Sequence, residues 1–174
     1  MRSIDDVQRP NWPTTGSEEH SLWTFVDFER ATLAMKCAGL SDEQLATVAN
    51  PPSTLSLLGL LRHMANNERY WYEEIFLGRK VPAHFASKTD EDADFDQLDS
   101  MSVSEVVDVW LTQCDVTRSI VKGRSLDEVS VDKPEYLESP ANLRFLAMHS
   151  IEEYARHCGH ADFLRQQIDG STGY

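Results

Sequence analysis

Four segments of the chain repeat their apolar residues at steps of three and four, which is the period of a helix with one buried face. They span residues 17–39, 55–77, 103–122 and 143–170. No segment alternates apolar and polar residues convincingly, as a half-buried strand does. Long amphipathic helices must bury their apolar faces against one another, so the sequence predicts an all-α four-helix bundle.

Residues that start and stop helices support these limits. Ser17 is followed by Glu18 and Glu19, which is a serine N-cap with acids where the helix dipole favours them. Glycine stands at or just after the end of each segment, at positions 39, 78, 123 and 170. The sequence Ser-Asp-Glu-Gln at 41–44 matches a capping box and predicts a short extra helix that ends near Ala49.

The segments divide the chain into one domain with a short piece at each end. With 174 residues the chain has the length of a single domain with its own core. We therefore expect an N-terminal arm over residues 1–16, one bundle domain over 17–170 and a tail over 171–174. Residues 79–100 are predicted to form a long link between the second and third helices, and the acidic run at 90–94 is expected to face solvent.

Charge and composition exclude several functions. A formal net charge of −13 argues against a nucleic-acid or anionic membrane partner. No apolar run approaches the roughly 20 residues that span a bilayer, and the first 12 residues lack the apolar core of a signal peptide. The three cysteines are widely spaced and form no Cys-x-x-Cys motif. They are interpreted as reduced thiols, which predicts a cytoplasmic protein.

The fourth segment carries the residues with the most distinctive chemistry. His149, Glu153 and His157 follow one another at four-residue steps, and His160 lies one turn beyond. They share their helix face with two leucines, so this face is expected to point into the bundle. Burying such groups without partners costs several kcal/mol, and a divalent metal would provide a partner.

Spacing alone leaves several ligand pairs open on this helix. Residues four apart are separated by about 6 Å along the axis, whereas His149 and His157 are about 12 Å apart and too distant for one ion. The remaining pairs are His149 with Glu153, Glu153 with His157, and His157 with His160. His63 on the second segment also shares a face with apolar residues, and a core histidine with one hydrogen-bond partner is the alternative there.

Other polar residues near these positions have simpler interpretations. Arg62, Arg69 and Arg156 flank the candidate ligands and are either anion-binding groups or solvated partners of nearby acids. Glu68, five residues after His63, is expected to be exposed. Cys158 lies about 100° around the helix from His157 and is predicted to face elsewhere.

Two motifs together resemble the DinB-like superfamily of metalloenzymes. They are LSLLGLLRHM at 55–64 and IEEYARHCGHAD at 151–162, and the likeness extends over nearly the whole chain. Members of the superfamily are four-helix bundles of up-down-down-up topology, with one metal-binding histidine on the second helix and a His-x-x-x-His pair on the fourth. Here the pair is Glu153-x-x-x-His157, which is similar to the metal-binding domain of mycothiol-dependent maleylpyruvate isomerases.

The resemblance implies a ligand set. It points to His63, Glu153 and His157 as metal ligands, with His160 just outside. Beside this set, His160 and His149 are each interpreted as a possible fourth ligand or as a polar, hydrogen-bonding neighbour of the site. Zinc is the first choice of metal, with nickel, iron or manganese as alternatives, because histidine and carboxylate ligands suit several metals. Two histidines and one carboxylate leave coordination positions open, which is the catalytic pattern for zinc.

The resemblance also implies a reaction class. The metal would activate a thiol or water against a small electrophile, as in a thiol S-transferase or hydrolase, with mycothiol as a candidate low-molecular-weight thiol. The related isomerases carry a further C-terminal domain and this chain ends at Tyr174, so isomerase activity is not expected. Family members are often dimers, which favours a homodimer. The alternatives are a non-catalytic, stress-related bundle that binds a metal or small molecule, and a polar core network without metal.

Overall fold

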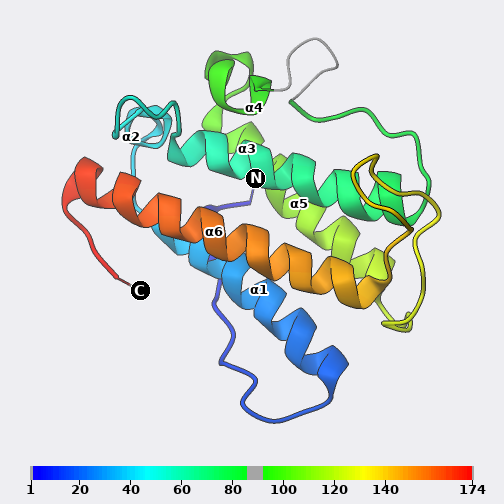
Figure 1. The fold of residues 1–174 in the computed structure, drawn as a ribbon. Helices are drawn as coiled ribbons and strands as arrows, with labels where there is room; N and C mark the ends of the chain where they lie inside the picture. Colours follow the sequence, from blue (N-terminus) through cyan, green and yellow to red (C-terminus); the bar gives the residue numbers. More distant parts are fainter. Residues whose placement is uncertain (1, 86–91, 174) are drawn as a thin grey trace.

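The computed structural model describes residues 2–85 and 92–173, and this part of the chain is all-α (Figure 1). Its long helices are α1 (Glu18–Cys37), α3 (Leu57–Glu68), α5 (Val103–Val121) and α6 (Leu143–Asp169), and the π-helical η2 (Arg69–Phe76) extends α3. They coincide with the four predicted segments, so the prediction of a four-helix bundle is confirmed. Within these residues the only β pairing is one isolated antiparallel bridge, Val129 to Asn142.

The helix directions explain the long link. In Figure 1, α1 and α6 run from right to left, whereas α3 with η2 and α5 run from left to right. Because α3 and α5 run in the same direction, the chain must return along the bundle between them. The return carries two short elements, α4 (Ala93–Asp96) and η3 (Leu98–Ser100). The topology is therefore up-down-down-up.

The caps occur where the sequence places them. The Ser17 hydroxyl accepts a hydrogen bond from the backbone N–H of His20 and starts α1. Ser41 and Gln44 form the predicted capping box of the short α2 (Asp42–Ala46). Gly170 ends α6 in the left-handed conformation, with a φ of 79°. Near the N-terminus η1 (Ile4–Asp6) lies against α1, and the Asp5 carboxylate accepts from the N–H of Gly39.

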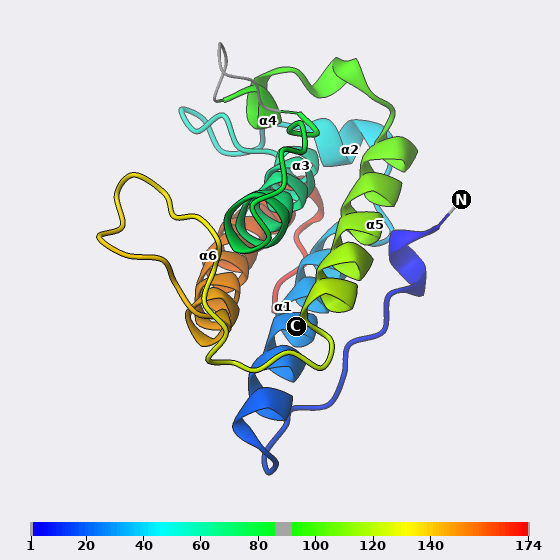
Figure 2. The same ribbon diagram turned by 90° about the vertical axis from the view of Figure 1, so that its right-hand side faces the viewer.

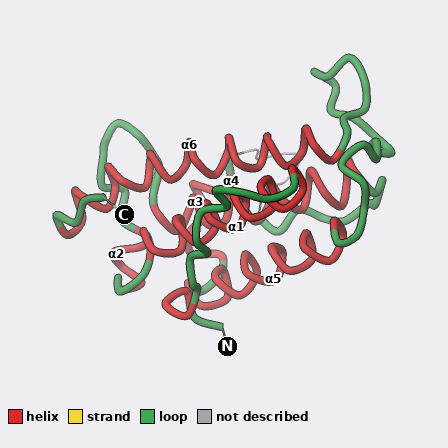
Figure 3. The backbone as a smooth tube through the Cα atoms, turned by 90° about the horizontal axis from the view of Figure 1, so that it is seen from below, coloured by secondary structure: helices red, strands yellow, loops and turns green. Residues whose placement is uncertain are grey.

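The second long helix is the centre of the molecule. Helix α3 contacts α1, α2, α4, α5 and α6. Figure 2 shows it near the middle of the bundle, and Figure 3 shows α5 and α6 on opposite sides with α1 and α3 between them. Almost every residue of α3 is buried as a result. None of the helices in the described residues is long and apolar enough to span a bilayer.

This central position contradicts the prediction for Glu68. The side chain was expected to be exposed, but Glu68 is 1 % exposed and forms an ion pair with Arg30 of α1. The prediction assumed that α3 has a solvent-facing side like an outer helix. Neighbouring elements cover α3 on most sides, and of its residues only His63 and Asn67 are not buried, so a charged residue elsewhere on it needs a buried partner.

Candidate metal centre

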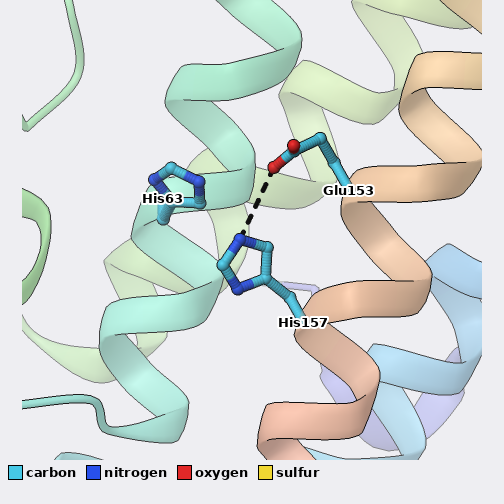
Figure 4. Close-up of side chains that lie close together, drawn as sticks. All are labelled: His63, Glu153 and His157. Atoms are coloured by element: carbon cyan, nitrogen blue, oxygen red, sulfur yellow. Dashed lines mark ion pairs between the residues drawn. The ribbon is translucent and has the colours of Figure 1, made fainter. Parts of the chain in front are cut away.

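Three of the predicted ligands meet at the seam between α3 and α6. His63 of α3 faces Glu153 and His157 of α6 across this seam (Figure 4). One potential ligand atom from each residue lies within 4.8 Å of the other two. His157 Nε2 is 3.6 Å from Glu153 Oε2, and the His63 and His157 ring centroids are 4.8 Å apart. The fold has therefore brought together residues that are 90 or more positions apart in the sequence.

The helix geometry explains this convergence. Glu153 and His157 are four residues apart on α6, so both side chains project from the same face. Their side chains are only 11 % and 10 % exposed, whereas the His63 side chain is 28 % exposed. The cluster is thus more enclosed on the α6 side than on the side of His63.

The nitrogen of His63 that faces away from the cluster, Nδ1, has a partner of its own. Asp94 Oδ2 of α4 lies 3.3 Å from His63 Nδ1, and the Asp94 side chain is buried. With Nδ1 donating to this carboxylate, Nε2 keeps its lone pair for a metal. The ring of Phe95 stacks on the His63 ring, with centroids 5.3 Å apart, and limits its rotation.

Asp94 was missed by the sequence analysis and corrects one prediction. The acidic run at 90–94 was expected to face solvent, and the prediction is wrong for Asp94, which is 4 % exposed. Asp92 is exposed as expected, while residues 90 and 91 lie outside the described residues. Asp94 is 31 positions from His63 in a segment without helical periodicity, so no local pattern links the two residues.

The two α6 residues also have partners on the atoms that face away from the cluster. Arg156 donates to Glu153 Oε1 at 3.0 Å, which leaves Oε2 toward His157. A hydrogen bond from His157 lowers the pKa of Glu153 against the opposing effect of burial. His157 Nδ1 lies 3.3 Å from His160 Nδ1. Burial and the neighbouring His157 lower the pKa of His160, so a neutral His160 is available as the acceptor.

His149 lies beside the cluster and outside the trio that includes His63. Its Nδ1 is 3.2 Å from Glu152 Oε2, and it forms a second close group with Glu152 and Glu153. Its ring stacks on Phe145 and meets Trp71 edge-on, at centroid distances of 5.9 and 4.6 Å. Of the three same-helix pairs left open by spacing, Glu153 with His157 is the pair that meets His63 in the described residues.

The flanking arginines are already engaged within the protein. Arg62 is 1 % exposed and donates to the carbonyls of Asp94 and Ala93 at 2.9 and 2.8 Å. Arg69 donates to Glu74 and to the carbonyl of Val81, each at 2.8 Å. Arg156 pairs with Glu152 and Glu153. The interpretation as solvated partners of acids therefore holds for Arg156, whose side chain is 53 % exposed, but not for Arg62 and Arg69, which are buried.

Cys158 faces away from the cluster, as predicted, and lies against α1, with its Sγ 3.7 Å from the carbonyl oxygen of Glu29. It is buried and contributes nothing to the cluster.

The donor set fits a divalent metal. Two imidazole nitrogens and one carboxylate oxygen converge, and each of the three residues has its other polar atom bonded to a different neighbour. Metal-binding histidines in proteins characteristically have such partners on their second nitrogen. Three protein ligands leave at least one coordination position open, which is the arrangement of catalytic zinc sites.

Comparisons with known proteins agree with this fold. The sequence model of one protein family, described as mycothiol-S-transferase, matches residues 21–170. A crystal structure described as that of the conserved protein of locus from Enterococcus faecalis superposes with a TM-score of 0.54. It shares 15 % sequence identity, and the alignment covers 90 % of this chain and 100 % of that one, so this likeness shows the fold alone. A search of curated proteins gives no significant match.

Proposed function

Because the chain belongs to the mycothiol-S-transferase family, a group of DinB-like helical bundles, we propose that it is a metal-dependent enzyme that joins mycothiol, through its thiol sulfur, to a small electrophile. The observation that carries the proposal is the convergence of His63, Glu153 and His157 at the seam between α3 and α6. Zinc is the metal we expect, although nickel, iron and manganese also suit two histidines and a carboxylate.

Each residue of the cluster has a distinct task in this proposal. His63, Glu153 and His157 would hold the metal, which would supply an open coordination position and lower the pKa of a thiol bound there. Asp94, Arg156 and His160 keep the three ligands in one orientation through the bonds on their outward-facing atoms. The neighbouring rings of Trp71, Phe145 and His149 form an aromatic wall beside the cluster.

The proposed reaction balances without any further reactant. The thiol loses its proton, its sulfur forms a bond to an electrophilic carbon, and the leaving group departs with its electron pair. If the electrophile is a conjugated acceptor, no group leaves and a neighbouring carbon takes up a proton. The products are a thioether of mycothiol and, in the first case, the protonated or anionic leaving group.

The protein's own thiols are poor alternatives as the nucleophile. Cys37, Cys114 and Cys158 are all buried. Burial raises the pKa of Cys37 to about 12 and raises the pKa values of the other two thiols as well. The reactive form of a cysteine is its thiolate, which is scarce at neutral pH under these conditions. This supports a thiol that enters from solution.

The test has two stages. Metal content is measured first by inductively coupled plasma mass spectrometry on protein purified without chelator, and about one equivalent of a transition metal per chain is expected. His63→Ala and His157→Ala should lose this metal and keep their helical circular dichroism, whereas the control His20→Ala, at an exposed position on α1, should keep both. Stoichiometric metal in both site variants would remove the ligand assignment.

The second stage measures turnover. The metal-loaded protein is incubated with monochlorobimane and mycothiol, bacillithiol, glutathione or no thiol, and thioether formation is followed by fluorescence. With mycothiol as the thiol, we expect the wild type to form the thioether faster than the His157→Ala variant does. If mycothiol raises the melting temperature but no electrophile is consumed, the protein is a binding module. If chelator leaves the melting temperature unchanged and added zinc is not bound, the cluster is a polar network.

A further inference from the structure

We propose that Asp94 is a positioning residue of the metal centre, so that α4, which carries it, belongs functionally to the site. This inference rests on the proposed metal-binding function. Asp94 is carried by α4, a helix of four residues within the link, and it lies against His63 on the central helix α3. Among the residues bonded to the cluster's outward-facing atoms, Asp94 comes from neither helix that carries the ligands.

Both carboxylate oxygens of Asp94 have assigned partners. Oδ2 lies 3.3 Å from His63 Nδ1, and Oδ1 accepts from the amide nitrogen of Asn66 at 2.6 Å. Two different partners fix the plane of the carboxylate, so it cannot turn away from His63 without losing a buried hydrogen bond. A fixed acceptor keeps the proton of His63 on Nδ1 and directs Nε2 toward Glu153 and His157.

Asn66 ties the two sides of the link to the same point of α3. While its amide nitrogen donates to Asp94, its carbonyl oxygen accepts from the backbone N–H of His84 at 2.7 Å. The side chain of His84 continues the contact to α5, with Nε2 3.0 Å from Gln113 Oε1. Residues 84 and 94 are thereby both held to α3 by one buried amide.

Arg62 holds the backbone that carries Asp94. Its guanidinium donates to the carbonyls of Asp94 and Ala93 and to the Ser100 hydroxyl, at 2.9, 2.8 and 3.0 Å. The same guanidinium lies over the ring of Phe85, 4.4 Å from its centroid. This buried arginine therefore donates hydrogen bonds to three residues of one short segment and restricts its movement. The same segment carries Asp94, the partner of the candidate ligand His63.

The decisive variant is Asp94→Asn, with Asp96→Asn as its matched control. Asp96 lies on the same short helix and is exposed, so both variants remove one negative charge from α4 but only the first touches His63. The two donors lie on different oxygens of Asp94, so an asparagine at 94 must turn its NH2 group toward His63 or toward Asn66 and loses one of the two hydrogen bonds. We expect zinc affinity, measured by competition with a chromophoric chelator, to fall by about 10- to 100-fold in Asp94→Asn. Asp96→Asn should match the wild type.

Two readouts separate positioning from general stability. The absorption spectrum of the cobalt-substituted protein should change in Asp94→Asn, because the geometry at His63 changes, and remain the same in Asp96→Asn. A purely structural Asp94 would instead lower the melting temperature of the metal-free protein and leave zinc affinity and the cobalt spectrum intact, which would overturn the proposal. If Asp94→Asn does not fold, Asn66→Ala keeps the carboxylate but frees its Oδ1, and a smaller loss of zinc affinity is expected.

Failure of this proposal is distinct from failure of the proposed function. If the wild type binds zinc and Asp94→Asn binds it equally well with the same cobalt spectrum, Asp94 has no positioning role and the metal site stands. If neither the wild type nor any variant binds zinc, nickel, iron or manganese, the proposed function fails and the positioning role fails with it.

Discussion

Arg30 of α1 donates to both carboxylate oxygens of Glu68 of α3, at 2.8 and 2.7 Å, and both side chains are almost completely buried. The hydroxyl of Tyr154 donates to the same carboxylate at 2.5 Å and in turn accepts from the indole of Trp110 at 3.0 Å. Tyr154 directly follows Glu153 on α6. This buried network therefore joins all four long helices and anchors α6 next to one of the candidate ligands.

Removing the Glu68 charge should destabilise the protein strongly. Glu68→Gln removes the buried counter-ion of Arg30 and leaves its guanidinium only Asp27, whose side chain is 37 % exposed, and breaking one side of a buried pair costs about 3–5 kcal/mol. Urea unfolding followed by circular dichroism measures the change, with the exposed Glu19→Gln as the control. An Arg30→Met/Glu68→Met double variant should recover much of the loss, since no uncompensated charge remains. If the double variant loses as much unfolding free energy as the Arg30→Met and Glu68→Met single variants lose together, this account is contradicted.

The same pair should make stability fall in acid. Burial alone raises the pKa of Glu68, but the charge of Arg30 and the hydrogen bonds from Arg30 and Tyr154 lower it below its ordinary value of 4.5. A lowered folded-state pKa contributes stability that is fully present above pH 4.5 and is lost as the pH falls through the folded-state value. The stability difference between wild type and Glu68→Gln should thus be constant above pH 4.5 and shrink below it. A difference that grows in acid would contradict the lowered pKa.

The sequence predicted the helices and the trio at the seam, but not what surrounds them. Helix limits are local properties, set by caps such as Ser17 and Gly170, and the four-residue step of Glu153 and His157 places both on one face. The choice of Glu153 and His157 among the open pairs, and of His63 as their partner, came from the family resemblance and not from spacing.

The failures involve contacts between distant segments. Glu68 was expected in solvent because its neighbours on α3 do not reveal that five other elements cover this helix. Asp94 was expected in solvent because it stands in an acidic run, and only the return of the link onto α3 makes it a partner of His63. Burial of single charged residues depends on tertiary packing, which an amphipathic pattern does not encode.

The three cysteines should be inert in the native protein. Burial raises the pKa of Cys37 to about 12 and shifts the other two thiols in the same direction. A colorimetric thiol reagent at neutral pH should therefore react only slowly with the folded protein. After denaturation it should react readily with all three thiols. Cys158→Ser should keep turnover with added mycothiol. Fast labelling of one thiol in the native state, with loss of activity, would instead indicate an internal nucleophile.

His160 should tune the metal site without being essential for it. His160→Ala removes the group 3.3 Å from His157 Nδ1, and a loss of about tenfold in zinc affinity is expected. Chelator competition measures this loss. His160→Gln supplies a carbonyl acceptor of similar reach and should restore part of the affinity. If His160→Ala instead abolishes binding as completely as His157→Ala does, His160 is itself a ligand.

Two helical glycines offer a matched test of how closely the link must approach α3. A Cβ at Gly59 would lie 2.9 Å from Cδ1 of Phe95 and 3.2 Å from the Ser56 hydroxyl, whereas a Cβ at Gly159 on α6 would meet nothing within 4 Å. Phe95 neighbours Asp94 on α4 and stacks on His63, so its ring cannot move without disturbing that histidine. Gly59→Ala should weaken zinc binding by about tenfold, because α4 is pushed from α3 and the bond between Asp94 and His63 is stretched.

Gly159→Ala should raise the stability of the protein and leave zinc binding unchanged. Alanine in an exposed helix interior is more favourable than glycine by up to about 1 kcal/mol, so the melting temperature of this variant should rise. Chelator competition and thermal unfolding on both variants decide the outcome. Zinc affinity equal to the wild type in Gly59→Ala would mean that α4 can shift without disturbing His63, which contradicts the coupling between the link and the candidate ligand.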